Sequence, residues 1–158
     1  MADAQPQLLS DLALRLVDSR ALSIYAVREE PQRASGKSAA GRTVISRDLL
    51  TVASRDNLAQ AITLRLLTPK GELAALAHPE YGCRLHELIG APNTATTRNL
   101  AKLHVIDALK QERRIAAIKE VKVSAHPGER QRIDLFIQVQ PIGSSSVLDV
   151  GPFTLDLS

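Results

Sequence analysis

The sequence predicts an α+β fold in which a helical layer packs on a small, mainly antiparallel sheet. Residues 58–66 repeat apolar side chains at the spacing of a helix that lies on a core. Residues 133–139 alternate between apolar and mostly polar side chains, as in a strand with one buried face. Turn sequences rich in Gly and Pro separate these segments. The chain has 158 residues, a length typical of one domain, so we expect residues 1–158 to form a single domain.

The composition limits the classes of protein that this chain can represent. Aromatic residues make up only 3% of the chain and the formal net charge is +3. Stacking platforms for single-stranded nucleic acid are therefore nearly absent, and the positive charge is too small to indicate a nucleic-acid-binding protein. The chain has one cysteine, Cys83, which excludes an internal disulfide and suits a reducing compartment. Residues 1–10 lack the pattern of a signal peptide, and we expect no direct membrane insertion.

The first third of the chain predicts strands around a loop. Alternating leucines favour a strand over residues 11–18, and a second strand follows over residues 22–27. Residues 28–42 are polar and have no periodicity, which predicts a mobile surface loop. Residues 44–52 form the next expected strand.

Two helices and a helical turn are expected in the middle of the chain. Ser54 or Asp56 can cap the first helix, which should end at Thr68 because Pro69 follows. Residues 84–89 predict about one and a half helical turns. Asn93 or Thr94 can cap a longer helix, whose wide apolar arc predicts burial on more than one side. The two apolar arcs consist of Leu58, Ala61, Ile62 and Leu66, and of Leu100, Leu103, Val105, Ile106 and Leu109.

The last third predicts a β-meander over about residues 119–157. Residues 130–140 and 147–157 should form neighbouring strands, with Phe153, Leu155 and Leu157 on one face of the last strand. An outer strand of such a sheet leaves backbone N–H and C=O groups unpaired, which makes it a template for another chain. The last strand carries only Asp149 and Asp156 as charges, although Pro152 removes one donor.

Two turns organise the centre of the chain. The first contains Pro69, Gly71 and Glu72, and the second contains Pro79, Tyr81 and Gly82. Pro restricts the residue before it, and Gly permits backbone angles that other residues resist. Two such turns within a short span should fix three helical pieces relative to one another. This is a scaffold rather than a catalytic pocket.

The order of these motifs resembles a known family. Leu67-Thr68-Pro69-x-Gly71-Glu72 is followed by Pro79-x-Tyr81-Gly82 and then by a helix that ends in Glu112-Arg113-Arg114. This pattern is similar to the baseplate wedge proteins of contractile tails, which have relatives in type VI secretion and extracellular injection systems. The resemblance covers residues 48–139. One position departs from the family pattern, because Arg113 stands where the family usually has Pro.

The resemblance implies a structural protein without catalysis or cofactor, and a sheath-handshake-like sheet. Six copies would surround the tube in a baseplate and contact other wedge proteins, the sheath protein, and tube or spike hub proteins. Glu112, Arg113 and Arg114 would contact the wedge partner. The strand that carries Phe153, Leu155 and Leu157 would face the sheath and seat its first ring. Assembly would take place in the bacterial cytoplasm, and the mature protein would lie in the baseplate of a particle.

A peptidoglycan glycoside hydrolase is the enzyme alternative. Glu72, Glu80 and Glu87 cluster around the second turn, and paired carboxylates can cleave a glycosidic bond. A sugar-binding groove is usually lined by aromatic side chains, however, and the chain has no Trp and only two Tyr. The structural alternative is that Glu72 and Glu80 bond turn amides or pair with Arg65 and Arg84.

A DNA-binding module is the second alternative. The long helix and the segment that follows it are basic, although cations near a helix C-terminus also complement the helix dipole. An acidic protein partner fits this charge better, because Arg114 can hold a carboxylate in a bidentate fork. The cations are Lys102, Lys110, Arg113, Arg114, Lys119 and Lys122.

Two further motifs are weak. Gly36-Lys37-Ser38 resembles the end of a phosphate-binding loop, but it lacks the upstream Gly and the helix that such a loop requires. His78, Cys83, His86 and His104 are potential zinc ligands, but their spacing is not that of a common structural site. We therefore expect Cys83 to be a small buried side chain, and no nucleotide or metal to be bound.

Overall fold

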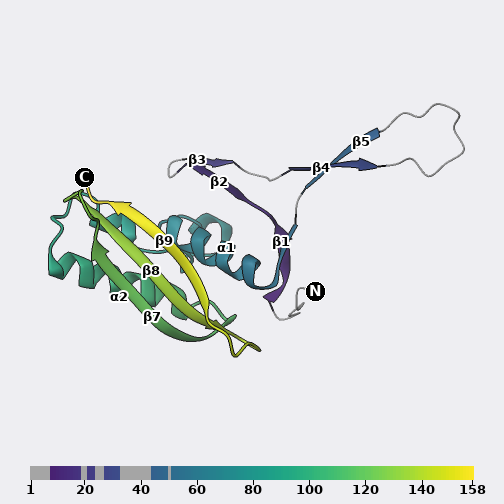
Figure 1. The fold of residues 1–158 in the computed structure, drawn as a ribbon. Helices are drawn as coiled ribbons and strands as arrows, with labels where there is room; N and C mark the ends of the chain where they lie inside the picture. Colours follow the sequence, from purple (N-terminus) through teal and green to yellow (C-terminus); the bar gives the residue numbers. More distant parts are fainter. Residues whose placement is uncertain (1–7, 19–20, 24–26, 33–43, 50) are drawn as a thin grey trace, which may run out of the picture.

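The computed structural model describes residues 8–18, 21–23, 27–32, 44–49 and 51–158. Two α-helices cover one face of a three-stranded antiparallel sheet (Figure 1). This arrangement confirms the predicted α+β fold with a helical layer on a small antiparallel sheet. The core lies between the two layers and is built almost entirely from aliphatic side chains.

The sheet has the strand order β7-β8-β9. Its strands are β7 (Ile115–Ala125), β8 (Arg132–Pro141) and β9 (Leu148–Asp156). In β8 the side chains alternate between buried and half-buried, and Ile133, Ile137 and Val139 have no exposed surface. The central strand thus has the pattern that its sequence predicts. β7 begins at Ile115, earlier than the meander expected from about residue 119.

Helix α1 (Ser54–Leu67) ends directly before Thr68 and Pro69, as predicted. The prediction for its beginning was wrong, because the N-cap is Ala53 and this residue makes no side-chain cap hydrogen bond. The Ser54 amide instead donates to the carbonyl oxygen of Leu9 at 3.1 Å. A neighbouring segment of the chain therefore satisfies the first amide of the helix, which has no acceptor within the helix.

Helix α2 (Ala95–Lys110) begins after Thr94, whose side chain accepts a hydrogen bond from the Thr97 amide. Thr94 is one of the two residues that were predicted to cap this helix. The predicted burial of its whole apolar arc was wrong. Leu100 and Leu103 are 41% and 56% exposed. The small side chains of Ala101 and Ala108 are buried instead, and the two leucines lie on a side of the helix that stays exposed. The buried face consists of Thr97, Ala101, Val105, Ala108 and Leu109.

Two 3₁₀ turns lie between the helices. They are η2 (Ala74–Leu76) and η3 (Leu85–Leu88). The second corresponds to the helical turn expected over residues 84–89, and it buries Leu85 and Leu88.

The N-terminal strands correct three predictions. The strand expected at residues 11–18 is divided into two, which pair with different partners. Only residues 22–23 of the strand expected at 22–27 lie in β3, and residue 27 opens β4. Residues 28–32 of the expected loop also lie in β4, where they pair with β5. They can do so because backbone pairing between strands needs no periodic apolar face. Residues 33–42 of the expected loop lie outside the described residues. The strands are β1 (Ser10–Leu12), β2 (Arg15–Asp18), β3 (Ala21–Ser23), β4 (Val27–Gln32), β5 (Val44–Leu49) and β6 (Thr51–Ala53).

Strand β1 ties the N-terminal segment to α1. It pairs with β6, and Leu8 before it is fully buried in the core. The Asn57 side chain donates to the Leu8 carbonyl at 2.9 Å, and Gln60 bonds the backbone of residues 12 and 14. Strands β4 and β5 extend away from the helix and sheet layers (Figure 1).

Candidate functional site

The two central turns are joined by their backbones. The Cys83 amide donates to the Thr68 carbonyl at 2.8 Å, and the Lys70 amide donates to the Cys83 carbonyl at 3.0 Å. A third bond, 3.4 Å long, runs from the Gly71 amide to the Tyr81 carbonyl. The two turns, which are separate motifs in the sequence, therefore form one structural unit at the C-terminal end of α1.

Gly82 is required at the closest point of this unit. Its φ is +107°, and a Cβ atom added to it would lie 2.6 Å from the Thr68 carbonyl oxygen. Backbone atoms on the facing turn cannot move aside as a flexible side chain can. Gly71 also has a positive φ, +90°, but a Cβ there would meet open space. Gly82 is thus needed for both its backbone angle and its contact, and Gly71 for the angle alone.

The second turn and the exit of α2 meet through Arg65. Its guanidinium lies 4.4 Å from the centre of the Tyr81 ring, a cation–π distance. The same guanidinium lies 3.7 Å from the Glu112 carboxylate. Glu112 also binds Arg114 in a bidentate fork, with distances of 2.8 and 3.1 Å. We call these four residues, Arg65, Tyr81, Glu112 and Arg114, the arginine–glutamate cluster.

The electrostatics of the cluster follow from its partial burial. Burial is the largest single effect on the Glu112 carboxyl and raises its pKa, but the hydrogen bonds and charges of Arg114 and the charge of Arg65 outweigh it. The pKa of Glu112 therefore lies below its usual value. The hydrogen bonds to Glu112 raise the pKa of Arg114, and burial raises that of Tyr81. All three shifts keep the cluster in one charge state near neutral pH.

A shallow groove of about 500 Å³ opens beside this cluster. Three arginines and two carboxylates line it, so its charged lining has an excess of one positive charge. Arg113 is its exposed cation, and Asp11 from the N-terminal segment stands on the wall. The lining residues are Leu9, Ser10, Asp11, Asn57, Arg65, Gln111, Glu112, Arg113 and Arg114.

The structure brings together the predicted turn residues and the predicted interface residues, which the sequence did not connect. The residue that connects them is Arg65. The sequence predicted that Arg65 pairs with Glu72 or Glu80, and this prediction was wrong. Arg65 is only 9% exposed, and its Nε has no hydrogen-bond partner among the described residues. Its position on the apolar stripe of α1, three residues after Ile62, is the sequence signal that marks it as an inward-facing charge.

The fork of Arg114 is occupied within the chain. Its fork was expected to hold a carboxylate of a partner, but it holds Glu112 of its own chain. Arg113 has a different position, because its side chain is exposed on the groove. Arg113 lies next to the ion pair of Glu112 and Arg114, and it is more accessible than Arg114.

The carboxylates considered for hydrolysis lie apart from this groove. Glu80 pairs with Lys70 at 2.8 Å, and Glu87 pairs with Arg84 at 2.9 Å. The hydrogen bond and charge of Lys70 lower the pKa of Glu80. Glu72 is exposed on the first turn. Among the described residues, neither the groove nor the apolar pocket described below is lined by any of these three carboxylates.

Two of the four potential zinc ligands, Cys83 and His86, have side chains that contact the backbone. The Cys83 thiol donates to the His104 carbonyl at 3.4 Å, and His86 Nδ1 lies 3.2 Å from the Cys83 carbonyl. No group of three or more His, Cys, Asp or Glu residues suited to hold a metal ion occurs in the described part of the chain. Burial raises the pKa of Cys83, as expected for a small buried side chain. The Gly36-Lys37-Ser38 motif lies outside the described residues.

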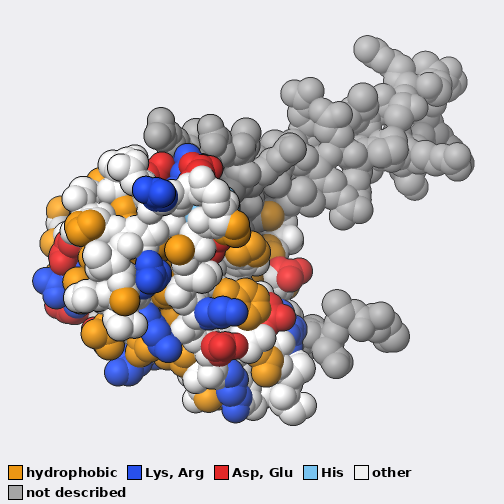
Figure 2. Space-filling model, turned by 60° about the vertical axis from the view of Figure 1, so that its left-hand side comes forward, with side chains coloured by type: hydrophobic (Ala, Val, Ile, Leu, Met, Phe, Trp, Pro, Cys, Tyr) orange, Lys and Arg blue, Asp and Glu red, His pale blue; other side chains and the backbone are white. Residues whose placement is uncertain are grey.

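The cations expected on α2 and after it are distributed over α2, the groove and β7. Lys110 lies 3.8 Å from Asp107, and Lys119 and Lys122 are exposed on β7. On the face drawn in Figure 2, Lys and Arg side chains are interspersed with acidic and hydrophobic ones. A continuous basic stripe, which a nucleic-acid-binding surface needs, is not present on that face.

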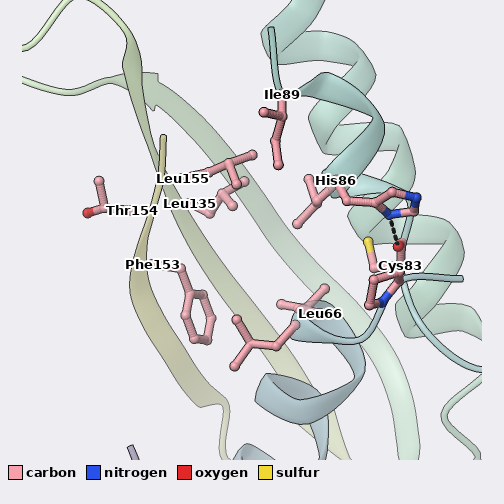
Figure 3. Close-up of a pocket in the computed structure, with 11 residues that line it drawn as sticks. Leu66, Cys83, His86, Ile89, Leu135, Phe153, Thr154 and Leu155 are labelled. Atoms are coloured by element: carbon pink, nitrogen blue, oxygen red, sulfur yellow. Dashed lines mark hydrogen bonds between the residues drawn. The ribbon is translucent and has the colours of Figure 1, made fainter. Parts of the chain in front are cut away.

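The C-terminal strand borders an apolar pocket of about 200 Å³. The side chains of Phe153 and Leu155 point from β9 toward Leu66, His86 and Ile89, whereas Thr154 points away (Figure 3). Leu157 is buried. The face shared by Phe153, Leu155 and Leu157 is therefore turned toward the helical layer. The pocket residues are Leu66, Leu67, Pro69, Cys83, Leu85, His86, Ile89, Leu135, Phe153, Thr154 and Leu155.

Within the described residues, no helix is both long and apolar enough to cross a membrane.

Comparison with known proteins identifies a family and a fold. The sequence model of the family described as baseplate wedge protein gp25 matches residues 52–141, more than half of the chain. A crystal structure of a putative tail lysozyme from Geobacter sulfurreducens is similar, with a TM-score of 0.58 and 22% sequence identity. The similarity covers 68% of this chain and 95% of that one. At this identity the likeness concerns the fold alone. No curated protein matches the chain.

Proposed function

Because the chain belongs to the baseplate wedge protein family, and is thus a structural component of a tail baseplate, we propose that it joins neighbouring wedge proteins and seats the first sheath ring. The family match over residues 52–141 carries this proposal. The particle would be a contractile tail or a related injection machine with six copies in its baseplate. Assembly would take place in the bacterial cytoplasm, before the protein becomes part of the particle.

The wedge contact would lie at the groove beside the arginine–glutamate cluster. Its lining carries one more positive than negative charge, and the Arg113 side chain is exposed there. The internal pair of Glu112 and Arg114 fixes the chain direction at the exit of α2 through three hydrogen bonds. This bonding offers a physical substitute for the restriction that Pro would impose at position 113. An acidic segment of a wedge partner fits this surface.

Charge reversal at Arg113 tests the wedge contact. The variant Arg113→Glu should fold normally and fail to join the wedge complex, because it adds a carboxylate where the partner's acidic side chains would bind. Lys119→Glu on β7 is the matched control, since it makes the same charge change at another exposed position. Co-purification of tagged variants with the wedge proteins gives the readout. Equal incorporation of both variants would refute the contact at Arg113.

Arg114→Ala is a less selective test of the same contact. It should also reduce incorporation, but it would leave Glu112 without its bidentate partner. Loss of assembly in that variant could therefore result either from a lost interface or from a weakened fold. The comparison of Arg113 with Lys119 avoids this problem.

The sheath contact would use the three-stranded sheet. In the described part of the chain, no strand pairs with the outer side of β9. We expect an extended segment of the sheath protein to add there, with main-chain hydrogen bonds as the major source of affinity. Leu148, Val150 and Leu157 of this segment are buried in the core, so circular dichroism must first show that a protein truncated before residue 147 still folds. Baseplates that contain the folded truncated protein should then form without a sheath. Full-length sheath on such baseplates would refute this part of the proposal.

The proposed role includes no hydrolysis of peptidoglycan. The solved structural relative is named as a putative tail lysozyme, but its similarity concerns the fold. Glu80 and Glu87 are each paired with a cation of the same chain and border neither described cavity. A zymogram on peptidoglycan should show no clearing by the wild-type protein. Clearing by the wild type that is lost in Glu80→Gln would establish the enzymatic alternative.

A further inference from the structure

We propose that the apolar pocket beside β9 is an anchor site for one large aliphatic side chain, of leucine or methionine size, carried by the sheath segment that adds to this strand. The inference rests on the proposed sheath contact and specifies what the sheet edge recognises. Seven of the lining residues come from outside the sheet. Four of them, Leu66, Cys83, His86 and Ile89, lie opposite Phe153 and Leu155 (Figure 3).

The volume of the pocket fits one side chain. A pocket for a drug-sized ligand has about 300 Å³ or more, and this pocket has about 200 Å³. An apolar cavity of about 150 Å³ is already large enough to hold benzene. The pocket is therefore too small for a typical cofactor and large enough for a leucine or methionine side chain.

The rim of the pocket is apolar and exposed. Leu67, at the end of α1, is 51% exposed, and Ile89, after η3, is 56% exposed. These two residues flank the pocket on the side of the helical layer. An inserted aliphatic side chain would cover both and remove their apolar surface from water. Among the described lining residues whose side chains point toward the pocket, a polar or charged side chain would find only the His86 ring and the Cys83 thiol.

The neighbouring sheet edge selects an extended occupant. A strand that adds to β9 would lie about 4.8 Å from it, with side chains alternating between the two faces of the sheet. Those on the inner face would stand beside Phe153 and Leu155, directly over the pocket. At the end of the strand, the Gly90 amide donates to the Leu157 carbonyl at 2.7 Å. This bond occupies one backbone acceptor and ends the free edge close to the pocket.

The opposite edge of the sheet is less suited to strand addition. β7 carries Lys119, Glu120 and Lys122, and charged side chains on an edge strand discourage pairing with another chain. β9 carries only Asp149 and Asp156, near its two ends. The edge at β9 has few charges and adjoins the apolar pocket, so it is the edge better suited to strand addition.

Substitution of the rim tests the anchor. Binding of the purified sheath protein to the full-length chain is measured by calorimetry for the wild type, Ile89→Glu and Leu103→Glu. Leu103 on α2 is the matched control, because it is also 56% exposed and does not line the pocket. We expect Ile89→Glu to weaken binding at least ~10-fold, which corresponds to about 1.4 kcal/mol. Leu103→Glu should bind as the wild type does.

A second variant and a direct contact measurement complete the test. Leu67→Glu, at the other exposed rim residue, should weaken binding as Ile89→Glu does while the melting temperature stays unchanged. In the complex, nuclear Overhauser contacts should join the methyl groups of Leu85 and Leu155 to an aliphatic side chain of the sheath protein. Wild-type affinity in both rim variants, or contacts to a second copy of this chain, would overturn the anchor and leave the sheath contact standing. Absence of sheath binding by the wild type would instead refute the proposed sheath contact itself.

Discussion

Two arginine–carboxylate networks in this protein have similar geometry and different surroundings. In the arginine–glutamate cluster, the Arg114 Nε lies 2.8 Å from Glu112, and the two side chains are 19% and 10% exposed. At the far end of the sheet, the Arg132 Nε lies 3.1 Å from Asp156, and both side chains are 39% exposed. Arg132 also reaches Glu129 at 2.7 Å.

The difference shows that burial rather than distance determines how much each network contributes. Exposed ion pairs gain little, because water and salt screen the charges and the long side chains lose freedom. A buried pair need not stabilise the fold more than apolar side chains would, but loss of one partner leaves an uncompensated charge. The arginine–glutamate cluster should therefore be sensitive to substitution, and the Arg132 network tolerant of it.

The largest expected effect is that of Glu112→Gln. This change keeps the size of the side chain but leaves Arg65 and Arg114 without their shared carboxylate. We expect a loss of about 3 kcal/mol in the free energy of unfolding, from the cost of breaking a buried pair. Urea denaturation measures it. Asp156→Asn is the matched control at the exposed network and should shift the urea midpoint only slightly. Equal losses in the two variants would remove the distinction.

Substitution of Gly82 should disturb the same cluster by displacing the backbone of the turn that carries Tyr81. Gly82→Ala places a Cβ atom 2.6 Å from the Thr68 carbonyl and should displace the turn that carries Tyr81. Gly71→Ala meets only the cost of its positive φ. We expect Gly82→Ala to lose about 2 kcal/mol more than Gly71→Ala, a typical cost of combined strain and overpacking. Thermal unfolding of both variants measures the difference, and similar melting temperatures would contradict the close approach.

The pH dependence of unfolding provides a smaller effect. The pKa of Glu112 is lowered in the folded protein, so its contribution is present above the unfolded pKa of about 4.5 and is lost as the pH falls through the folded value. The wild-type free energy of unfolding should therefore decrease below pH 4.5. Glu112→Gln should have a shallower curve there. An identical slope in both proteins would show that Glu112 does not titrate as described.

Asp156 should titrate over a different range. Hydrogen bonds from Ser158, followed by the one from Arg132, lower its pKa from 3.8 to about 2. Its contribution is thus lost between about pH 4 and pH 2, and nuclear magnetic resonance can follow this carboxyl directly.

The smallest expected effect is that of salt. Raising the ionic strength to 1 M reduces the Debye length to about 3 Å and screens exposed charges strongly. The small effect of substituting Asp156 should disappear in 1 M NaCl, whereas most of the loss caused by Glu112→Gln should remain. Urea midpoints of the two variants and the wild type at low and high salt give the comparison. A loss at Glu112 that vanishes with salt would show that the cluster is solvated.

Local sequence signals identified the elements whose causes are themselves local. The end of α1 before Pro69 follows from the restriction on the preceding residue, and the cap at Thr94 follows from a hydroxyl that bonds the nearby Thr97 amide. The alternation in β8 follows from the period of a strand with one buried face. The order of the turn motifs also placed the chain in its family, which the match over residues 52–141 confirms.

The sequence failed where a residue's role depends on distant partners. The Ser54 amide bonds Leu9, and residues 28–32 form a strand because residues 44–48 lie beside them. Leu100 and Leu103 have the spacing of core residues, but the buried side of α2 is the one that carries Ala101 and Ala108.

The sequence by itself determined the fold class, the turns and the family, because short-range sterics and the periodicity of apolar side chains encode them. Only the tertiary structure joined Arg65 to Tyr81 and Glu112, and only it placed Leu67 and Ile89 around a pocket beside β9. These contacts connect residues more than 15 positions apart along the chain. No local pattern records them, because they form only when the helical layer packs on the sheet.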